Sequence, residues 1–224
     1  MAGGGFGRAR KRSQKKEEES FDEVSNDNSS NEEASGEQLS QTDVDLKLEK
    51  GNLNFEDSAL YQIEFKGVEL NGANFSNCSF DEVMFEDADL SSSNFSEISM
   101  NKVIFRDVEL QKASFSDSDQ SDVQYDDVSL KLVDFGDSSL KGCSFNNADL
   151  KKARFTSIEG NDLKFNDCDL VNSDFSDAAL KSIKFTDIAF GKTSFADSDI
   201  SDMSIENSEG SLVTDDGEID CEDY

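Results

Sequence analysis

Histidine, proline and tryptophan are absent from this chain of 224 residues, and basic residues are few, 21 against 50 acidic ones. Without histidine the chain lacks the commonest general base and metal ligand, so we expect no catalytic residues and no enzyme activity. It also lacks a glycine-rich nucleotide loop, a calcium loop of EF-hand spacing and a nonapeptide calcium repeat. We therefore expect neither a metal site nor a cofactor.

Long apolar runs are missing as well. No segment has the apolar region of a signal peptide, and none is long enough to cross a bilayer, so the sequence predicts neither secretion by a signal peptide nor a membrane span. We expect a cytoplasmic protein, with a nuclear or organellar location open if the source is eukaryotic.

What the chain does have is a strict period. Phenylalanine recurs every twenty residues from Phe55 to Phe195 without a slip in register. A second column, offset by ten residues, is also aromatic, a third is mainly leucine, and a looser fourth runs from Leu60 to Ile200. The predicted core columns are Phe55, Phe75, Phe95, Phe115, Phe135, Phe155, Phe175 and Phe195, then Phe65, Phe85, Phe105, Tyr125, Phe145, Phe165 and Phe185, then Leu70, Leu90, Leu110, Leu130, Leu150 and Leu170.

A large residue at nearly every fifth position matches neither the helical period of 3.6 nor the strand period of two. A chain that turns a corner every five residues keeps all of these residues inside. The smaller residue two positions before each large one fits the alternation of a very short strand. Four such units make one turn, so we predict a square β-solenoid of seven to eight coils, roughly 35 Å long at the usual strand spacing.

The repeated units resemble those of a known family. Ala73-Asn74-Phe75-Ser76-Asn77 and Ala148-Asp149-Leu150-Lys151-Lys152 fit the repeats A(D/N)FxX and A(D/N)LxX. Over residues 53–207 the chain resembles the pentapeptide repeat proteins. The resemblance implies an all-β fold, the right-handed quadrilateral β-helix of that family. It implies little about activity, because the family is functionally broad and a fold does not determine a function.

The first 37 residues are rich in Gly, Ser, Glu and Asn and nearly free of apolar residues, so we predict a disordered tail over 1–37. Residues 1–16 carry six basic residues and no acid, whereas residues 17–37 carry nine acids and no base. The basic arm Arg8–Lys16 fits a solubilising tail that pairs with those acids. A nuclear-localisation signal, an anionic-surface contact and an organellar import signal are open alternatives.

Two further segments flank the repeat. Within residues 38–52, Val44, Leu46 and Leu48 alternate with polar residues, which predicts a strand that caps the first coil. Residues 208–224 contain acids and no bases, so we predict an acidic C-terminal tail. Such a tail is a weak cap, whose charges repel edge-to-edge association.

Three cysteines, Cys78, Cys143 and Cys168, occupy the small inward position of their units, where Ala and Ser also occur. They belong to three different sides of the solenoid, so they cannot stack into disulfides. We interpret them as small core residues in a reducing compartment. Cys221 lies in the acidic tail and has no evident partner.

Gln120 and Gly160 interrupt the fourth column two coils apart. A buried glutamine needs hydrogen-bond partners, and Gly160 leaves space that the large inward residue Ile158 would partly fill. These positions are interpreted as tolerated core defects, with a local bulge or a binding dent as the alternative.

Because the period assigns each outward residue to a side, the surface charges can be mapped. The side of Leu60 has lysines that alternate with acids by coil, the side of Phe65 has more acids than bases, and the side of Leu70 is balanced. The side of Phe55 has a single base, Arg154. Its acids form the candidate interaction surface: Glu56, Asp57, Glu97, Asp117, Asp134, Asp137, Asp174, Asp177 and Asp197.

The charge map and the family resemblance lead to two candidate functions. The first is a non-catalytic scaffold that binds a protein partner through an acidic face. The second comes from the resemblance, because some pentapeptide repeat proteins protect DNA gyrase, a type II topoisomerase, as mimics of DNA. Members of that kind have an apolar C-terminal module, and some have projecting loops, both of which this chain lacks. The negative charge disfavours direct nucleic-acid binding by the solenoid, and the partner, the binding face and the oligomeric state are left open.

Overall fold

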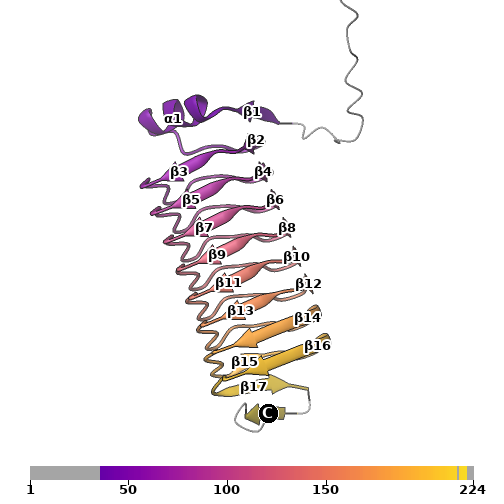
Figure 1. Ribbon diagram of the computed structural model, residues 1–224. Coiled ribbons are helices and arrows are strands. Elements are labelled where there is room, and N and C mark those ends of the chain that lie inside the picture. Colours follow the sequence, from indigo (N-terminus) through magenta and orange to yellow (C-terminus); the bar gives the residue numbers. More distant parts are fainter. Residues whose placement is uncertain (1–35, 216, 221–224) are drawn as a thin grey trace, which may run out of the picture. The chain divides into compact units, whose positions relative to one another are not determined.

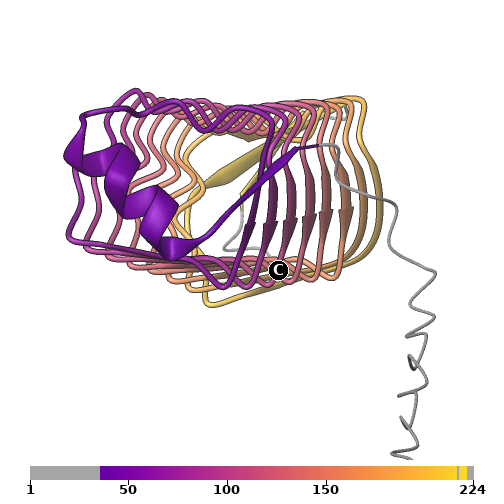
Figure 2. The same ribbon diagram turned by 90° about the horizontal axis from the view of Figure 1, so that it is seen from above.

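The computed structural model describes residues 36–215 and 217–220, which form the stacked coils of a β-solenoid (Figure 1). The predicted disorder of residues 1–37 falls almost wholly outside this range. Viewed from its N-terminal end, the solenoid runs clockwise as it recedes, so it is right-handed (Figure 2). The predicted all-β, quadrilateral fold is therefore confirmed.

Each coil has four sides, which we name after the first residue of each core column: the Phe55, Leu60, Phe65 and Leu70 sides. Strands on the Leu60 and Phe65 sides pair in parallel with partners twenty residues away, as Phe65 pairs with Phe85. Single parallel bridges hold the other two sides. The Leu60 side contains β2 (Ser58–Tyr61), β4 (Ser79–Asp81), β6 (Ser99–Asn101), β8 (Asp119–Ser121), β10 (Ser139–Lys141) and β12 (Glu159–Asn161). The Phe65 side contains β3 (Glu64–Lys66), β5 (Met84–Glu86), β7 (Ile104–Arg106), β9 (Gln124–Asp126), β11 (Ser144–Asn146) and β13 (Lys164–Asn166), and both sides share β14 (Ala179–Thr186) and β16 (Asp199–Glu206).

The predicted core columns are all buried, with no member more than 3% exposed. Within a column the rings stack, as Phe65 and Phe85 do with centroids 4.6 Å apart and planes at 4°. Between the two aromatic columns the rings meet edge-on, as Phe55 and Phe65 do at 5.8 Å and 88°. Such pairs add about 0.5–1.5 kcal/mol beyond the burial of their area. The aromatic columns thus align each coil on the next.

The corners have a conformation that the sequence analysis did not predict. The second residue after each large one has a positive φ, from Asp57 at 57° to Asn207 at 50°. More than half of these corner residues are Asp or Asn, which tolerate the left-handed region better than most residues. Leu132 is an apolar exception at φ 57°. Part of the acidity of this chain therefore has a backbone cause.

The N-terminal cap is a helix, so the predicted strand through Val44, Leu46 and Leu48 is wrong. After β1 (Glu37–Leu39), α1 spans Gln41–Glu49 and lies across the end of the solenoid (Figure 2). The side chain of Ser40 accepts from the backbone of Asp43, whose carboxylate accepts in return from the N–H of Ser40, a reciprocal capping box. Val44 is fully buried and Leu48 packs on the core, whereas Leu46 is 43% exposed. The spacing of four between the two inward residues suits one face of a helix.

The C-terminal segment is more ordered than the predicted acidic tail of residues 208–224. β15 (Thr193–Ser194) pairs in parallel with β17 (Ser211–Thr214), which forms an antiparallel hairpin with β18 (Gly217–Asp220). Leu212 is buried at 3% exposure. Together with β1 at the other end, this segment extends the solenoid to about nine turns, more than the seven to eight expected. This segment packs on the solenoid because the apolar side chain of Leu212, which lies among acidic residues in the sequence, is buried in the core.

Candidate functional site

The nine acids of the predicted surface separate into two groups. Asp134 and Asp174 are partly buried, and each accepts a backbone hydrogen bond from the residue two positions later, at 2.8 and 3.0 Å. These two carboxylates therefore stabilise the turns of the Phe55 side. The other seven, all exposed, are Glu56, Asp57, Glu97, Asp117, Asp137, Asp177 and Asp197.

Arg154 neutralises the middle of the Phe55 side. Its Nη1 lies 2.9 Å from Oδ1 of Asp134, and its Nη2 lies 3.8 Å from Asp137. The guanidinium lies over Gly136, where a Cβ would be only 2.3 Å from Nη1. Because glycine has no side chain, the guanidinium of Arg154 can lie across the coil at this position.

Three more acids lie beside the exposed group, and the sequence analysis missed them because it assigned them to the Leu60 side. Asp119, Glu159 and Asp199 begin β8, β12 and β16, two residues after the corner positions. In each coil a single inward residue separates the corner position from the first residue of the strand, so both of these outward positions border the same corner. We call the exposed set along this corner the acidic strip: Asp57, Glu97, Asp117, Asp119, Asp137, Glu159, Asp177, Asp197 and Asp199.

The acidic strip is poorly compensated. Among the described residues, its one ion pair is the 3.8 Å contact of Asp137 with Arg154. Five of the six αL corner acids donate their backbone N–H to the next coil, as Asp117 does to Gly136 at 3.0 Å, and the sixth, Asp197, donates to the carboxylate of Asp215 at 2.8 Å. The strip is thus a row of exposed carboxylates on a fixed backbone.

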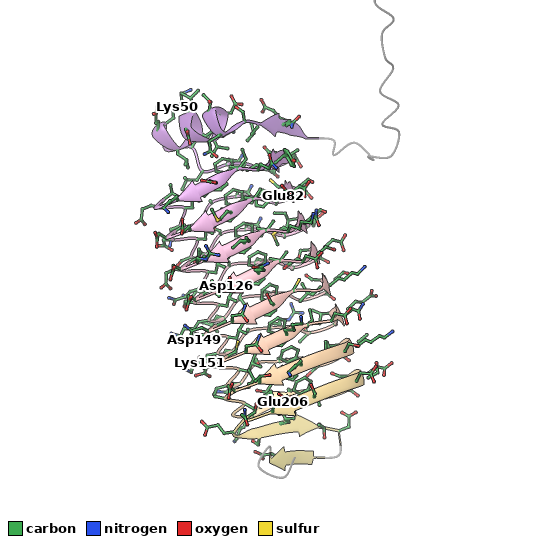
Figure 3. All side chains as sticks on the ribbon, in the orientation of Figure 1. Lys50, Glu82, Asp126, Asp149, Lys151 and Glu206 are labelled. Atoms are coloured by element: carbon green, nitrogen blue, oxygen red, sulfur yellow. The ribbon has the colours of Figure 1, made fainter. Side chains whose placement is uncertain are left out.

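The other sides have more ion pairs. On the Leu70 side Lys131 lies 2.9 Å from Asp149, and Lys151 bonds to Asp169, a contact that raises the pKa of the lysine. On the Phe65 side Lys184 pairs with Glu206 at 3.1 Å. Charged side chains project outward on these sides, as labelled Asp149, Lys151 and Glu206 do in Figure 3.

The expected charge ladder of the Leu60 side is only partly formed. Lys102 lies 3.9 Å from Glu82. No ion pair within 4.0 Å is found for Lys141 or Lys181 in residues 36–215 and 217–220. The lysines of this side therefore alternate with acids by coil without pairing closely.

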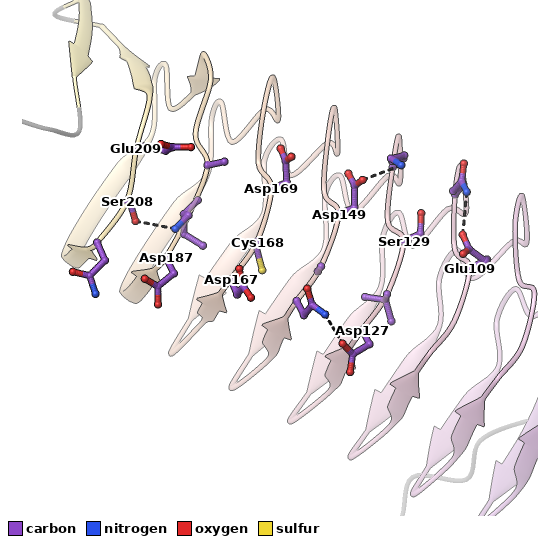
Figure 4. Close-up of a pocket in the computed structure, with 18 residues that line it drawn as sticks. Glu109, Asp127, Ser129, Asp149, Asp167, Cys168, Asp169, Asp187, Ser208 and Glu209 are labelled. Carbon is purple, nitrogen blue, oxygen red and sulfur yellow. Dashed lines mark hydrogen bonds and ion pairs between the residues drawn. The ribbon is translucent and has the colours of Figure 1, made fainter.

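A polar groove of about 820 Å³ runs along the opposite corner, between the Phe65 and Leu70 sides (Figure 4). Asp127, Asp167 and Asp187 line one wall, and Asp149 and Asp169 line the other. Within the described part of the chain, no three His, Cys, Asp or Glu side chains are arranged to hold a metal ion. The groove is a hollow of the corner with no convergent set of reactive groups.

The three inward cysteines are buried, as predicted, and they are free thiols. Burial raises the pKa of Cys78 and of Cys143 to about 11, and that of Cys168 to about 12. A thiol with so high a pKa is a poor nucleophile at neutral pH. The interpretation as small core residues is therefore supported, whereas Cys221 lies outside the described residues.

Gln120 has the partners that its burial requires. Its Oε1 accepts from the hydroxyl of Tyr125 at 2.8 Å, and its Nε2 donates to Ser118 at 3.0 Å. Ser118 contacts Ser138, which donates to the carbonyl of Phe115 at 2.7 Å. Tyr125 is the tyrosine of an otherwise phenylalanine column, and it lies one unit after Gln120. These two departures from the pattern are thus one buried network, a link that the sequence analysis missed.

Gly160 leaves no binding dent. A Cβ there would lie 2.8 Å from Leu180 and 2.9 Å from Leu163. These two leucines fill the space nearest to Gly160, and Ile158, expected to fill it in part, is buried in the same core. Gly160 is therefore a packing adjustment of the core.

No helix among the described residues has the length and apolar character needed to span a membrane. A search of curated proteins returned no match to this sequence.

Comparison with solved structures finds other solenoids at low identity. A trypsin-treated form of QnrB1, a plasmid-mediated fluoroquinolone resistance protein, is 14% identical, with a TM-score of 0.39 over 77% of this chain and 86% of that one. HetL of Nostoc sp. strain PCC 7120, involved in regulation of heterocyst differentiation, is 13% identical, with a TM-score of 0.32 over 79% and 97%. A protein of the Arabidopsis thaliana thylakoid lumen is 20% identical, with a TM-score of 0.30 over 55% and 68%. The latter two are described as pentapeptide repeat proteins.

The family profile described as "Pentapeptide repeat region" matches residues 48–115, 78–155 and 138–211. These overlapping matches cover well over half of the chain and include all the core columns. The five-residue units, the stacked square coils and the family profile agree, and the chain belongs to the pentapeptide repeat family.

Proposed function

We propose that this protein is a non-catalytic scaffold that binds a protein partner through its acidic strip. The observation that supports the proposal is the row of nine exposed carboxylates along one corner, with Arg154 alone, among the described residues, in an ion pair with them. A basic protein surface is the complementary partner. Long-range attraction between the two would raise the association rate more than the final affinity.

The rigidity of the solenoid supports this role. From Glu97 to Asp199 every coil contributes at least one carboxylate to the strip, and neighbouring coils are about 4.8 Å apart, the spacing of paired strands. Their backbone is already ordered, so binding costs little backbone entropy. A row of charges at fixed intervals can therefore select a partner whose basic groups have a matching spacing.

The chemistry of the described residues favours binding over catalysis. Histidine is absent from the whole sequence, and burial raises the pKa of all three described cysteines. The groove is lined mainly by carboxylates, amides and hydroxyls, and the thiol among its lining residues, Cys168, is buried with a raised pKa. A thiol of that kind is a poor nucleophile at neutral pH.

The test compares two triple variants with the same charge change. Asp117→Lys, Asp137→Lys and Asp177→Lys reverse the charge at three of the nine positions of the acidic strip. Asp107→Lys, Asp127→Lys and Asp167→Lys change the equivalent corner residues ten positions earlier, on the far side of each coil. Lysine is compatible with the backbone of such corners, because Lys102 and Lys112 have positive φ at the other two corners of the coil.

Affinity capture from cell extract with mass spectrometry should recover a specific partner with the wild type and the control variant. The strip variant should lose it, and purified partner should bind the wild type more weakly as salt rises. Equal loss from both variants, or recovery of non-specific basic proteins alone, would contradict the proposal.

A second function, mimicry of DNA toward a type II topoisomerase such as gyrase, is favoured by the charge density. Residues 54–207 contain 31 acids and 13 bases, a net charge of −18. Spread over coils at about 4.8 Å, this is roughly one negative charge per 2 Å of solenoid axis, against about one per 1.7 Å in B-DNA. A basic DNA-binding surface would therefore meet a similar density of charge.

A supercoiling assay with purified gyrase, run with and without a quinolone, separates the two functions. A mimic should inhibit supercoiling or protect the enzyme from the drug at micromolar concentration, and the strip variant should do so less. No effect of the wild type at that concentration would remove mimicry and leave the scaffold proposal standing.

A further inference from the structure

Among the described residues, the last coil of the solenoid has a strand edge without a partner. In each coil above it, the N–H of the corner residue on the Leu60 side donates to the next coil, as Asp122 donates to Lys141 at 2.9 Å and Asp162 to Lys181 at 3.0 Å. The carbonyl of the following residue accepts in the same way, as that of Leu163 does from Lys184. The corresponding groups of β16 are the N–H of Asp202 and the carbonyl of Met203. Within the described residues, β16 pairs only with β14, so both groups lack a strand partner.

The core beside this edge is also open. In β14 the inward residues Leu180, Ile183 and Phe185 are at most 2% exposed. Their equivalents in β16 are Ile200 and Ile205, which are only partly buried, and Met203, which is 36% exposed. The hairpin of β17 and β18 pairs with β15, on the Phe55 side of the solenoid. An apolar strip thus lies directly beside unpaired backbone groups.

The charges along this edge indicate what can cover it. Asp199, Asp202 and Glu206 are exposed, and in the described part of the chain Glu206 alone of the three has an ion pair, with Lys184 of the coil above. A second copy paired edge to edge would bring these acids close to their own equivalents, which is unfavourable. A strand with lysine or arginine on its outer face would complement them. The inner face of that strand would need apolar residues to cover Met203.

We propose that β16 is a docking site for an extended peptide segment of a partner protein, with apolar residues on its inner face and lysine or arginine on its outer face. The segment adds a strand to the Leu60 and Phe65 sides and continues the parallel ladder by one coil. Backbone hydrogen bonds supply affinity, and the alternate side chains supply selectivity. Asp199 is the one residue that this site shares with the acidic strip as defined above. The proposed docking does not depend on the proposed function.

The probe is a nine-residue peptide with valine or leucine at the positions that would lie beside Ile200, Met203 and Ile205, and lysine at those beside Asp199, Asp202 and Glu206. It is acetylated, amidated and labelled for fluorescence anisotropy with the full-length protein. Two control peptides test its two components. One replaces lysine with glutamate, and the other carries N-methyl groups on two consecutive central residues, which blocks a donor on each edge of the strand. Each control should bind at least about tenfold more weakly than the lysine peptide.

Two protein variants locate the site. Asp199→Lys, Asp202→Lys and Glu206→Lys should weaken binding at least about tenfold. The matched variant Asp119→Lys, Asp122→Lys and Asp126→Lys, which changes the same columns four coils earlier, should bind within about twofold of the wild type. Hydrogen exchange with bound peptide should show added protection in 199–206 and little change in β8.

Several results would overturn the proposal. Equal affinity for the N-methylated peptide would show attraction by charge without strand addition. Equal weakening by both protein variants would show that the whole solenoid attracts the peptide. If the free wild-type protein sediments as a dimer and the β16 variant as a monomer, a second copy occupies the edge. Unchanged binding after removal of residues 221–224 is expected, whereas binding that appears only after their removal would show that they are the occupant.

Discussion

The two ends of the solenoid differ in how completely the core and the strand edges are covered. At the N-terminal end, α1 covers the core with Val44, and the side chain of Gln41 pairs with the free edge of β3 through the N–H and the carbonyl of Glu64, at 2.9 and 3.0 Å. At the C-terminal end, the hairpin covers the coil near Leu212, but none of the described residues pairs with the outer edge of β16 beside Met203. A solenoid end therefore needs both an apolar cover and partners for its strand edge. Among the described residues, the N-terminal end has both, whereas the C-terminal end presents exposed acids along β16.

The largest expected effect tests the apolar cover of each end. Val44→Asp places a carboxylate at a fully buried position, and it should reduce the free energy of unfolding by about 3 kcal/mol or more. Met203→Asp, at a position already 36% exposed, should cost under about 1 kcal/mol. Urea unfolding followed by circular dichroism measures both. Equal losses would refute the difference between the ends.

The middle coils provide the reference for a fully enclosed core. Tyr125→Phe removes the hydroxyl that donates to Gln120 and leaves a buried acceptor unpaired, so it should cost about 1–3 kcal/mol. Adding Gln120→Leu restores an apolar column, and the double variant should recover most of that loss. Urea unfolding of the two variants measures the difference. If the double variant is less stable than Tyr125→Phe, the network contributes more than the satisfaction of its own groups.

A smaller effect concerns the edge of β3. Gln41→Ala removes both hydrogen bonds to the backbone of Glu64 and should cost about 1 kcal/mol. Hydrogen exchange at the amide of Glu64 should become faster, approaching that of β16. The control Gln62→Ala removes only a side-chain bond to Glu82, and it should change stability by less than about 0.5 kcal/mol. If exchange at Glu64 is unchanged, the side chain of Gln41 does not protect this strand edge.

The smallest effect is a dependence on pH at the helical end. Hydrogen bonds from Ser40 lower the pKa of Asp43 below its ordinary value of 3.8. A lowered pKa means that the cap stabilises α1 fully above about pH 4 to 5, and that this stabilisation is lost as the pH falls through the folded pKa. Amide exchange in α1 should therefore accelerate in acid relative to that of the middle coils. Asp43→Asn should remove this dependence, and an unchanged pH profile in that variant would contradict it.

The solenoid itself could be predicted because its information is local and repeated. A large residue every fifth position, from Phe55 to Ile205, leaves one regular winding that buries them all. The same register correctly located the buried cysteines and the aromatic stacks. The cap was predicted wrongly because Val44, Leu46 and Leu48 fit a strand by alternation, whereas Ser40 and Asp43 start a helix.

The candidate site was predicted only in part, because assigning acids to sides ignores the corners. Six of the nine predicted acids belong to the acidic strip. Asp134 and Asp174 have backbone partners, and Glu56 lies outside the strip. Asp119, Glu159 and Asp199 were omitted, since their large neighbours belong to another column. A corner brings together residues that the column count separates.

By itself, the sequence determined the winding, the register and the identity of the core columns, because a period without insertions has one solution that keeps phenylalanine away from water. Only the tertiary structure decided which charges share a corner, how Gln120 and Tyr125 satisfy each other, and which end of the solenoid is closed. These outcomes depend on contacts between residues in different columns, in successive coils or in the flanking segments, and no repeat of five specifies such contacts.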